Sequence, residues 1–356
     1  MKLIIADKIG SATTPADLTD PIMIREAVSV ARVGDVVAVR ALSESHSYGN
    51  LELPTGRLAK INRGDVFLGV LGKRRALKGF VGDIPDSLNA GDRLHLLNMG
   101  GVIGVCNGHH SSLSDAIEVE VLGAACRSDG RPINISDDAV RPADSLSQSA
   151  PIVLVAGTCM NSGKTVAAAE LIRQAANAGL IVAGAKLSGI ACLRDTLQMQ
   201  DYGASATSSF LDCGLPSTVD REDLATVAKA IFNQLNASQP DLIVAELGDG
   251  IIGGYSVDSI LRDGEIRSAI TSVVFCASDY VGVVGGIAVL RDLGLSIDVI
   301  AGSVTDSQMG EDFVESRYRI RAGNARRDGR RLFELAVQHE AREFSPPVMR
   351  EFALAQ

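Results

Sequence analysis

The sequence predicts an α/β protein in which a smaller, mostly-β barrel domain precedes a domain built around a parallel sheet. The chain has 356 residues, about twice the length of a typical domain. Short apolar runs alternate with Gly-Asp and Gly-Asn turns early in the chain, whereas continuous apolar runs alternate with helical patterns after Pro151. We therefore expect a barrel-like domain at residues 1–135, a linker at 136–150 and an α/β domain at 151–356.

Composition and charge argue against several classes of protein. The chain is 46% hydrophobic and 22% charged, which suits packed cores and not long disorder. Its net charge of −9 makes nucleic acid a poor default partner. The six cysteines form no CxxC pair, and we find neither a signal peptide nor an apolar run of about 20 residues. We expect a cytoplasmic protein with no membrane partner.

The N-terminal domain is expected to begin with one helix and continue as strands. Asp20 is an N-cap residue, and Pro21 suits the first helical position, so Pro21–Arg32 is predicted to be helical. From Val33 to about Ile135 the apolar runs are short and are separated by recurring turn signals. This pattern is typical of an all-β barrel or sandwich. Residues 136–150 are polar and aperiodic, as in a linker.

The second domain is expected to alternate strands and helices. The predicted strands are Ile152–Ala156, Leu180–Ala183, Leu242–Ala245, Ser272–Cys276 and Ile297–Ala301. The predicted helices are Lys164–Ala178, Arg221–Leu235, Val281–Leu293 and Arg327–Glu340. Strands that are apolar on both faces, joined by helices, indicate a parallel sheet covered on both sides. Ligands bind at the carboxyl ends of such strands.

The most informative motif lies between the first of these strands and the first helix. A loop there exposes backbone N–H groups at a helix N-terminus, which attracts phosphate. The residues expected to bind the nucleotide in this loop are Gly157, Thr158, Asn161, Ser162, Gly163, Lys164, Thr165 and Val166. Lys164 would neutralise β- and γ-phosphate oxygens, and the Thr165 hydroxyl would bind Mg²⁺. Five residues instead of four separate Gly157 from Gly163, so the spacing departs from the plain P-loop pattern.

Two further residues at strand ends are candidates for the chemistry. Glu246 ends a buried strand and would complete a Mg²⁺ site with Thr165, because Mg²⁺ prefers oxygen ligands. The alternative is that Glu246 caps the next turn. Lys186 also follows an apolar strand at the ligand edge, where it either contacts the substrate or extends to water. Asp195 and Asp201 compete to supply a second carboxylate.

Four segments in the same order resemble dethiobiotin synthetase and its relatives. They are Gly157–Thr165, Ala183–Gly189, Asp241–Gly250 and Gly302–Asp306, within a match of roughly residues 151–306. The resemblance implies that Lys164, Lys186 and Glu246 are catalytic, and that Lys186, Ser188 and Gly250 face the acceptor. It implies that Thr165, Asp201 and Glu246 hold Mg²⁺ and that Thr305 and Asp306 contact the base. Leu187, Leu247 and Thr305 replace the family's Pro, Gly and Asn.

Three hypotheses for function follow. The first is a Mg²⁺- and ATP-dependent ligase-type enzyme, with GTP as the alternative nucleotide and a small carboxylate or amine as second substrate. The second is a switch NTPase that controls a protein partner, and the third is a nucleotide-binding module without turnover. A homodimer is expected from the resemblance and from the apolar segment 282–290, for which the Arg327–Glu340 helix is the competing cover. Arginines between 317 and 331 form either a paired helix face or an anion-binding patch.

Overall fold

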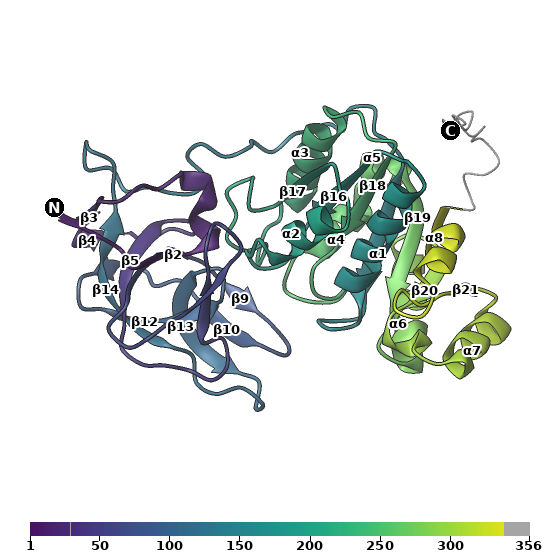
Figure 1. Cartoon of the computed structure of the whole chain (residues 1–356), viewed down its shortest axis with the longest axis horizontal. Coiled ribbons are helices and arrows are strands. Elements are labelled where there is room, and N and C mark those ends of the chain that lie inside the picture. Colours follow the sequence, from purple (N-terminus) through teal and green to yellow (C-terminus); the bar gives the residue numbers. More distant parts are fainter. Residues whose placement is uncertain (29, 338–356) are drawn as a thin grey trace, which may run out of the picture.

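The computed structural model describes residues 1–28 and 30–337. Two main sheets organise this part of the chain, one formed by N-terminal strands and one by strands after residue 151 (Figure 1). Within these ranges no helix is long and apolar enough to span a membrane. Residues 136–150 contain neither helix nor strand, and the predicted domain boundaries on either side stay a prediction.

The N-terminal part is made of short strands. Their bounds are β1 Lys2–Ile4, β2 Lys8–Ile9, β3 Ile22–Arg25, β4 Ala27–Val28, β5 Val36–Ala41, β6 Asn50–Glu52, β7 Leu58–Lys60, β8 Val66–Leu71, β9 Arg74–Arg75, β10 Phe80–Asp83, β11 Leu88–Asn89, β12 Arg93–Asn98, β13 Val102–His109 and β14 Glu118–Ala125, with a 3₁₀ helix, η1, at Ser11–Ala16. Strand β14 pairs with β5, β5 with β8, β8 with β13, and β13 with β12. Because β12 pairs back with β14, these strands close into a ring, which we call the N-terminal barrel.

The helix predicted at Pro21–Arg32 is wrong. Residues 22–25 form strand β3, which pairs with β1 and β14. The cause is visible in the burial pattern, since Ile22 and Ile24 are buried whereas Met23 and Arg25 are not. That period of two suits a strand, and the capping pattern of Asp20 and Pro21 was outweighed by pairing with remote strands.

The second part is an α/β structure. Its strands are β15 Ile152–Gly157, β16 Val182–Lys186, β17 Ala206–Ser209, β18 Leu242–Glu246, β19 Ile270–Cys276, β20 Val299–Ala301 and β21 Arg321–Ala322. Its helices are α1 Lys164–Asn177, α2 Arg194–Asp201, α3 Leu224–Asn236, α4 Val257–Arg262, α5 Gly264–Ala269, α6 Tyr280–Asp292, α7 Gln308–Tyr318 and α8 Gly329–Val337, with a 3₁₀ helix, η2, at Ser303–Thr305. The strands lie in the order β17-β16-β18-β15-β19-β20-β21 and all pair in parallel.

Both faces of this sheet are covered, as the apolar runs predicted. Along β15, Val153 and Val155 pack with residues of α1, α2 and α8, whereas Ile152 and Leu154 pack with residues of α3, α4 and α5. Each strand and helix predicted after residue 151 is present, with at least one end shifted by one or more residues. Residues 338–340 of the last predicted helix lie outside the described residues. The sheet order places β18 and β19 on either side of β15, so the loop after β15 opens where three strands end.

Candidate phosphate and metal site

The loop between β15 and α1 turns through left-handed backbone conformations just before the helix begins. Asn161 and Gly163 both have positive φ, 66° and 105°, and Gly163 is the residue that precedes the helix. Glycine tolerates that conformation, and a Cβ at Gly163 would also crowd the Cα of Gly302 at 3.1 Å. The first residues of α1, Lys164, Thr165 and Val166, line the pocket described below, where the positive end of the helix dipole favours an anion.

Lys164 crosses this loop. Its Nζ donates to the carbonyl oxygen of Cys159 at 2.7 Å and lies 3.5 Å from Ser162 Oγ. Burial lowers the pKa of Lys164, and the nearby carboxylate of Glu246 opposes that shift. The ammonium of Lys164 is buried inside the loop, and its contact with phosphate oxygens stays a prediction.

Glu246 joins the loop to the neighbouring strand β16. Its Oε1 accepts from Thr165 Oγ1 at 2.9 Å and from Lys186 Nζ at 2.7 Å. Lys186 Nζ also lies 2.6 Å from Asp195 Oδ2, so one ammonium bridges two carboxylates. The parallel register explains the meeting, because Glu246 lies beside Val155 of β15 and Lys186 of β16.

The charges in this cluster support one another. Burial disfavours the ammonium of Lys186, yet the carboxylates of Asp195 and Glu246 outweigh burial and raise its pKa. Burial likewise disfavours the carboxylate of Asp195, but Lys186 outweighs it and holds the pKa of Asp195 below its usual value. Lys186 is therefore a fixed cation at the ligand edge and does not extend freely to water.

The donor set fits Mg²⁺. Glu246 is 1% exposed, and its Oε2 has no hydrogen-bond partner among the described residues, so a buried oxygen is available as a ligand. The hydroxyl of Thr165 donates to Oε1, the other oxygen of the same carboxylate. No group of three His, Cys, Asp or Glu side chains within the described ranges could hold a metal alone. A site of one hydroxyl and one or two carboxylates suits Mg²⁺ that is bound together with phosphate and water.

The structure separates the two aspartates that competed for this site. Asp195 lies in the first turn of α2 and lines the pocket, whereas Asp201 is the last residue of α2 and is exposed. The expectation that Asp201 lies beside Thr165 and Glu246 is therefore corrected, because Asp195 and not Asp201 borders this cavity. The reason is the helix itself, because α2 carries the chain away from the strand ends before residue 201 is reached.

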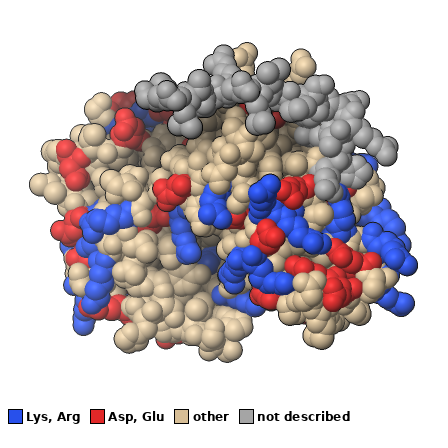
Figure 2. Space-filling view, turned by 45° about the vertical axis from the view of Figure 1, so that its right-hand side comes forward, with Lys and Arg blue, Asp and Glu red and all other residues tan. Residues whose placement is uncertain are grey.

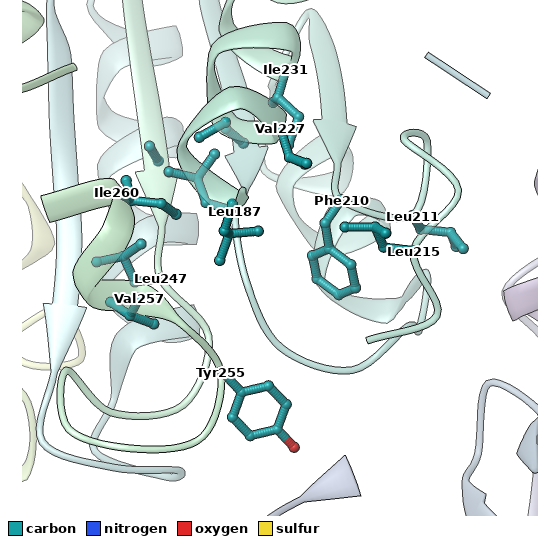
Figure 3. Close-up of a cluster of buried hydrophobic side chains, with 14 of the residues drawn as sticks. Leu187, Phe210, Leu211, Leu215, Val227, Ile231, Leu247, Tyr255, Val257 and Ile260 are labelled. Carbon is teal, nitrogen blue, oxygen red and sulfur yellow. The ribbon is translucent and has the colours of Figure 1, made fainter. Parts of the chain in front are cut away.

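Two predicted acceptor residues have packing roles instead. Ser188 is fully buried and its hydroxyl donates to the carbonyl oxygen of Gly248 at 3.1 Å. Gly250 lies against the phosphate loop, where a Cβ would clash with the carbonyl oxygen of Thr158. Leu187 and Leu247 point into a buried apolar cluster with Val257 and Ile260 (Figure 3). These positions shape the pocket from behind and do not face it.

Of the two residues expected to contact the base, Asp306 lines a cavity and Thr305 does not. Thr305 is fully buried and its hydroxyl donates to the carbonyl oxygen of Gly302 at 2.8 Å. Asp306 is exposed and lines a small cavity of about 90 Å³ beside Gly163. No sequence pattern pointed to Asn324, which follows β21, lines the same cavity and donates to Asp306 Oδ1 at 2.9 Å.

A cavity of about 520 Å³ lies at the strand ends. Loop residues Met160, Asn161, Gly163, Lys164, Thr165 and Val166 line one side, and Lys186, Gly189, Ile190, Arg194, Asp195, Gln198, Glu246, Gly248, Asp249, Tyr255 and Arg326 line the rest. Sequence reasoning missed Asp249, which has a φ of 61° and a pKa that burial raises. It also missed Tyr255, whose pKa burial raises to about 12. Asp249 follows Glu246 closely, so its nearness was a usable signal.

The arginines between residues 317 and 331 form mixed pairs and not a uniform basic patch. Arg331 lies 3.5 Å from Glu315, Arg330 lies 2.9 Å from Glu334, and Arg327 lies 3.3 Å from Glu311. Lys, Arg, Asp and Glu side chains are interspersed on the face that Figure 2 shows. Arg326 differs from them, because it lines both the large cavity and the small one.

Comparison with known proteins gives no family name. No family model and no curated protein matches the chain. Similar solved structures include the signal recognition particle receptor FtsY from Elizabethkingia anophelis (12% identity, 53% of this chain and 66% of that chain, TM-score 0.37). Others are the cell division protein FtsY from Thermotoga maritima (15%, 56% and 71%, TM-score 0.38) and a DUF1611 family protein from Anabaena variabilis (13%, 56% and 63%, TM-score 0.40). Such distant similarities assign no substrate, activity or partner.

Proposed function

We propose that this chain is a Mg²⁺-dependent P-loop NTPase that transfers the γ-phosphoryl group of a purine nucleotide to a small acceptor, a carboxylate or a carbamate formed from an amine. The carrying observation is that the phosphate loop, the Lys186–Asp195–Glu246 cluster and a further set of polar side chains line one cavity. Arg194, Gln198 and Tyr255 border this cavity but not the small one beside Asp306. That arrangement leaves room for a second molecule beside the phosphates.

The proposed step needs little covalent chemistry from the protein. An acceptor oxygen attacks the γ-phosphorus, the bond from that phosphorus to the β–γ bridging oxygen breaks, and the nucleoside diphosphate leaves with the electron pair. Lys164 and Lys186 stabilise the charge on the transferring group and the leaving oxygen. Mg²⁺, when bound at Thr165, Glu246 and Asp195, would neutralise charge on the β- and γ-phosphates.

The side chains beside the small cavity favour guanine over adenine. Asn324 is already saturated, because its amide donates to Thr305 and Asp306 and its oxygen accepts from the backbone N–H groups of Arg326 and Arg327. The carboxylate of Asp306 is then the group that meets the base, and it accepts hydrogen bonds only. Guanine presents two neighbouring N–H donors, whereas adenine presents one. Competition between GTP, ITP and ATP tests this, since equal affinity for all three would exclude recognition by Asp306.

A switch NTPase is the second candidate, and the helix α6 supports it. Val281 and Val284 on α6 are 80% and 49% exposed, although Val283 and Leu290 are buried. The competing cover, α8, packs on α1, β19 and β20. An apolar exposed face beside a nucleotide site suits a partner, and a second copy of the chain remains the proposed one. Light scattering with and without nucleotide tests the homodimer, and a strict monomer in both conditions would remove it.

The decisive experiment has two stages. Thermal shift and calorimetry with GTP or ATP, each with Mg²⁺ or EDTA, test binding, because a native-state ligand at 100 times its Kd stabilises by about 2.7 kcal/mol. Turnover is then measured with small carboxylates and amines, following phosphate release and phosphorylated product separately. Acceptor-dependent turnover supports the transferase or ligase, slow acceptor-independent hydrolysis supports the switch, and no binding at millimolar nucleotide would sink both.

A further inference from the structure

A buried carboxylate of the N-terminal half reaches the wall of the proposed phosphate site. Glu52 ends strand β6 and is 1% exposed. It accepts from the backbone N–H of Leu193 at 2.7 Å, from Cys192 Sγ at 3.1 Å and from Ser11 Oγ. Two of these three donors belong to the segment between β16 and α2, which we call the 187–193 segment. One acidic side chain therefore connects the two halves of the molecule.

Hydrogen bonds, and not a basic side chain, stabilise the carboxylate of Glu52. In the described part of the chain, no Lys, Arg or His forms an ion pair with Glu52. A buried carboxylate is costly unless donors replace its water, so the donors and the carboxylate hold one another in place. Burial and the charge of Glu52 raise the pKa of Cys192 well above its usual value, which keeps that thiol protonated and able to donate.

The bond to Leu193 fixes the start of a helix. Leu193 is the N-cap of α2, and its own side chain cannot cap the helix. The carboxylate of Glu52 therefore lies where the positive end of the helix dipole favours a negative charge. A second contact supports the same segment, because Asn98 Nδ2 of strand β12 donates to the carbonyl oxygen of Ala191 at 2.9 Å. The N-terminal half thus holds the segment at two points, through Glu52 of β6 and Asn98 of β12.

The helix start that Glu52 holds carries Asp195, one of the residues of the proposed Mg²⁺ site. Asp195 lies two residues after Leu193, in the first turn of α2, and its carboxylate lies 2.6 Å from Lys186 Nζ. Lys186 in turn lies 2.7 Å from Glu246. A short chain of contacts therefore runs from Glu52 through the start of α2 to the oxygen ligands proposed for Mg²⁺. This series of contacts meets the phosphate loop at Glu246, which accepts a hydrogen bond from Thr165.

We propose that Glu52 is a positioning residue through which the N-terminal half sets the place of Asp195 in the Mg²⁺ site. The proposal rests on the function proposed above. It differs from simple adhesion between the two halves, because adhesion would stabilise the fold without affecting how the site uses metal. Its consequence is that the N-terminal half is part of the active unit, and that any ligand or partner which moves strand β6 changes the requirement for Mg²⁺.

Glu52→Gln tests the proposal. The variant keeps the size of the side chain but turns one acceptor oxygen into a donor that faces the N–H, S–H and O–H groups now bound there. We expect the Mg²⁺ concentration for half-maximal turnover to rise about tenfold, within the usual range of coupling between sites, while nucleotide affinity in EDTA is unchanged. Glu120→Gln is the matched control, because Glu120 makes an exposed pair with Arg40 at 3.0 Å on the barrel. An unchanged Mg²⁺ requirement in Glu52→Gln would overturn the proposal.

A double-mutant cycle shows whether Glu52 acts through Asp195. If it does, Glu52→Gln raises the Mg²⁺ requirement in the parent chain but not in an Asp195→Asn background. Fully additive effects would contradict the positioning role. Should Glu52→Gln fail to fold, Cys192→Ala and Ser11→Ala each remove one donor and leave the Leu193 bond, and we then expect a smaller rise from each. A parental Mg²⁺ requirement in both substitutes would overturn the proposal.

Hydrogen exchange separates failure of this inference from failure of the proposed function. In the nucleotide-free chain, the amide of Leu193 is protected by its bond to Glu52, so Glu52→Gln should speed exchange in the 190–198 region about tenfold without changing exchange in α1. Glu120→Gln should leave both regions unchanged. If the parent chain binds no Mg²⁺-nucleotide, the function fails and this measurement still decides whether Glu52 fixes the segment. Parental exchange in Glu52→Gln would overturn the positioning role regardless of nucleotide binding.

Discussion

The phosphate loop and the 187–193 segment occupy equivalent places but are held in different ways. Each runs from the carboxyl end of a parallel strand into a helix, α1 in one case and α2 in the other. The phosphate loop has bonds among its own residues, since Lys164 donates to Cys159 and the amide of Ser162 donates to the same carbonyl group at 3.3 Å. Remote bonds add to these, because the amide of Thr158 donates to the carbonyl oxygen of Cys276 at 3.1 Å. The 187–193 segment is held mainly from outside, by Glu52 and Asn98 among others.

This difference teaches how the two loops depend on the rest of the molecule. A loop held by local contacts keeps its shape wherever its strand and helix form, so its sequence pattern is transferable. A segment held by remote side chains has the shape that those contacts impose, and its own sequence carries little signal. The candidate site combines both kinds, because Thr165 comes from the first loop and Asp195 follows the second.

Glu246→Gln is expected to have the largest effect, because Glu246 joins the two regions. Its carboxylate accepts from Thr165 on one side and lies beside Lys186 on the other. Removing the anionic metal ligand while keeping its size should lower turnover about 100- to 1,000-fold, the usual range for a lost electrostatic group. Nucleotide binding in EDTA should persist. Parental turnover would return Glu246 to the role of a structural cap.

Lys164→Ala tests the locally held loop. Losing a charged hydrogen bond to phosphate, worth about 1.5–3 kcal/mol, should weaken nucleotide affinity about 10- to 100-fold. Burial disfavours the charged form of Lys164 and lowers its pKa, so removing this ammonium should not lower the free energy of unfolding of the nucleotide-free protein. Calorimetry and melting curves measure both quantities. A variant that binds nucleotide like the parent would show that the loop has been assigned wrongly.

Asp195→Asn and Asp201→Asn form a matched pair on the same helix. Asp195 lines the cavity and pairs with Lys186, whereas Asp201 is exposed at the end of α2. We expect Asp195→Asn to raise the Mg²⁺ requirement about tenfold and Asp201→Asn to leave it unchanged. Turnover against Mg²⁺ concentration gives the comparison. The opposite order would restore the aspartate that the sequence resemblance favoured.

Gly250→Ala should have the smallest of these effects and tests how local the phosphate loop is. A methyl group at Gly250 would meet the carbonyl oxygen of Thr158, so the loop or the 248–250 turn must shift, at a cost of about 1–3 kcal/mol. Gly285→Ala in α6 is the control, because no atom beyond its chain neighbours and the backbone of its own helix lies within 4 Å of the added group. Denaturant unfolding of both variants measures the difference. Equal stability would mean that the phosphate loop accommodates the neighbouring turn freely.

Much of the fold was predictable because its signals are local. Apolar runs that alternate with helical patterns predicted the parallel sheet, and β18 with Glu246 at its end was predicted almost to the residue. The helix expected at residues 21–32 failed because strand pairing with β1 and β14 outweighs a capping pattern. The acceptor roles expected for Ser188 and Gly250 failed for a related reason. A predicted strand end indicates that a residue lies near the ligand edge of the sheet. It does not indicate whether the side chain faces the cavity or the buried core beside it.

The sequence by itself determined that strands β15, β16 and β18 form, because an apolar run is a local signal. Their predicted ends at Ala156, Ala183 and Ala245 lie one to three residues before the observed ends at Gly157, Lys186 and Glu246. Only the tertiary structure decided which side chains meet there. Asn324 joins Asp306 from 18 residues away, and Glu52 reaches Leu193 across 141 residues. Such pairs form when separate elements pack and bury polar groups that need partners, and no periodicity in the chain records them. The physical reason is that a buried charge selects its partners by position in space, whereas sequence patterns report only the local backbone and its exposed face.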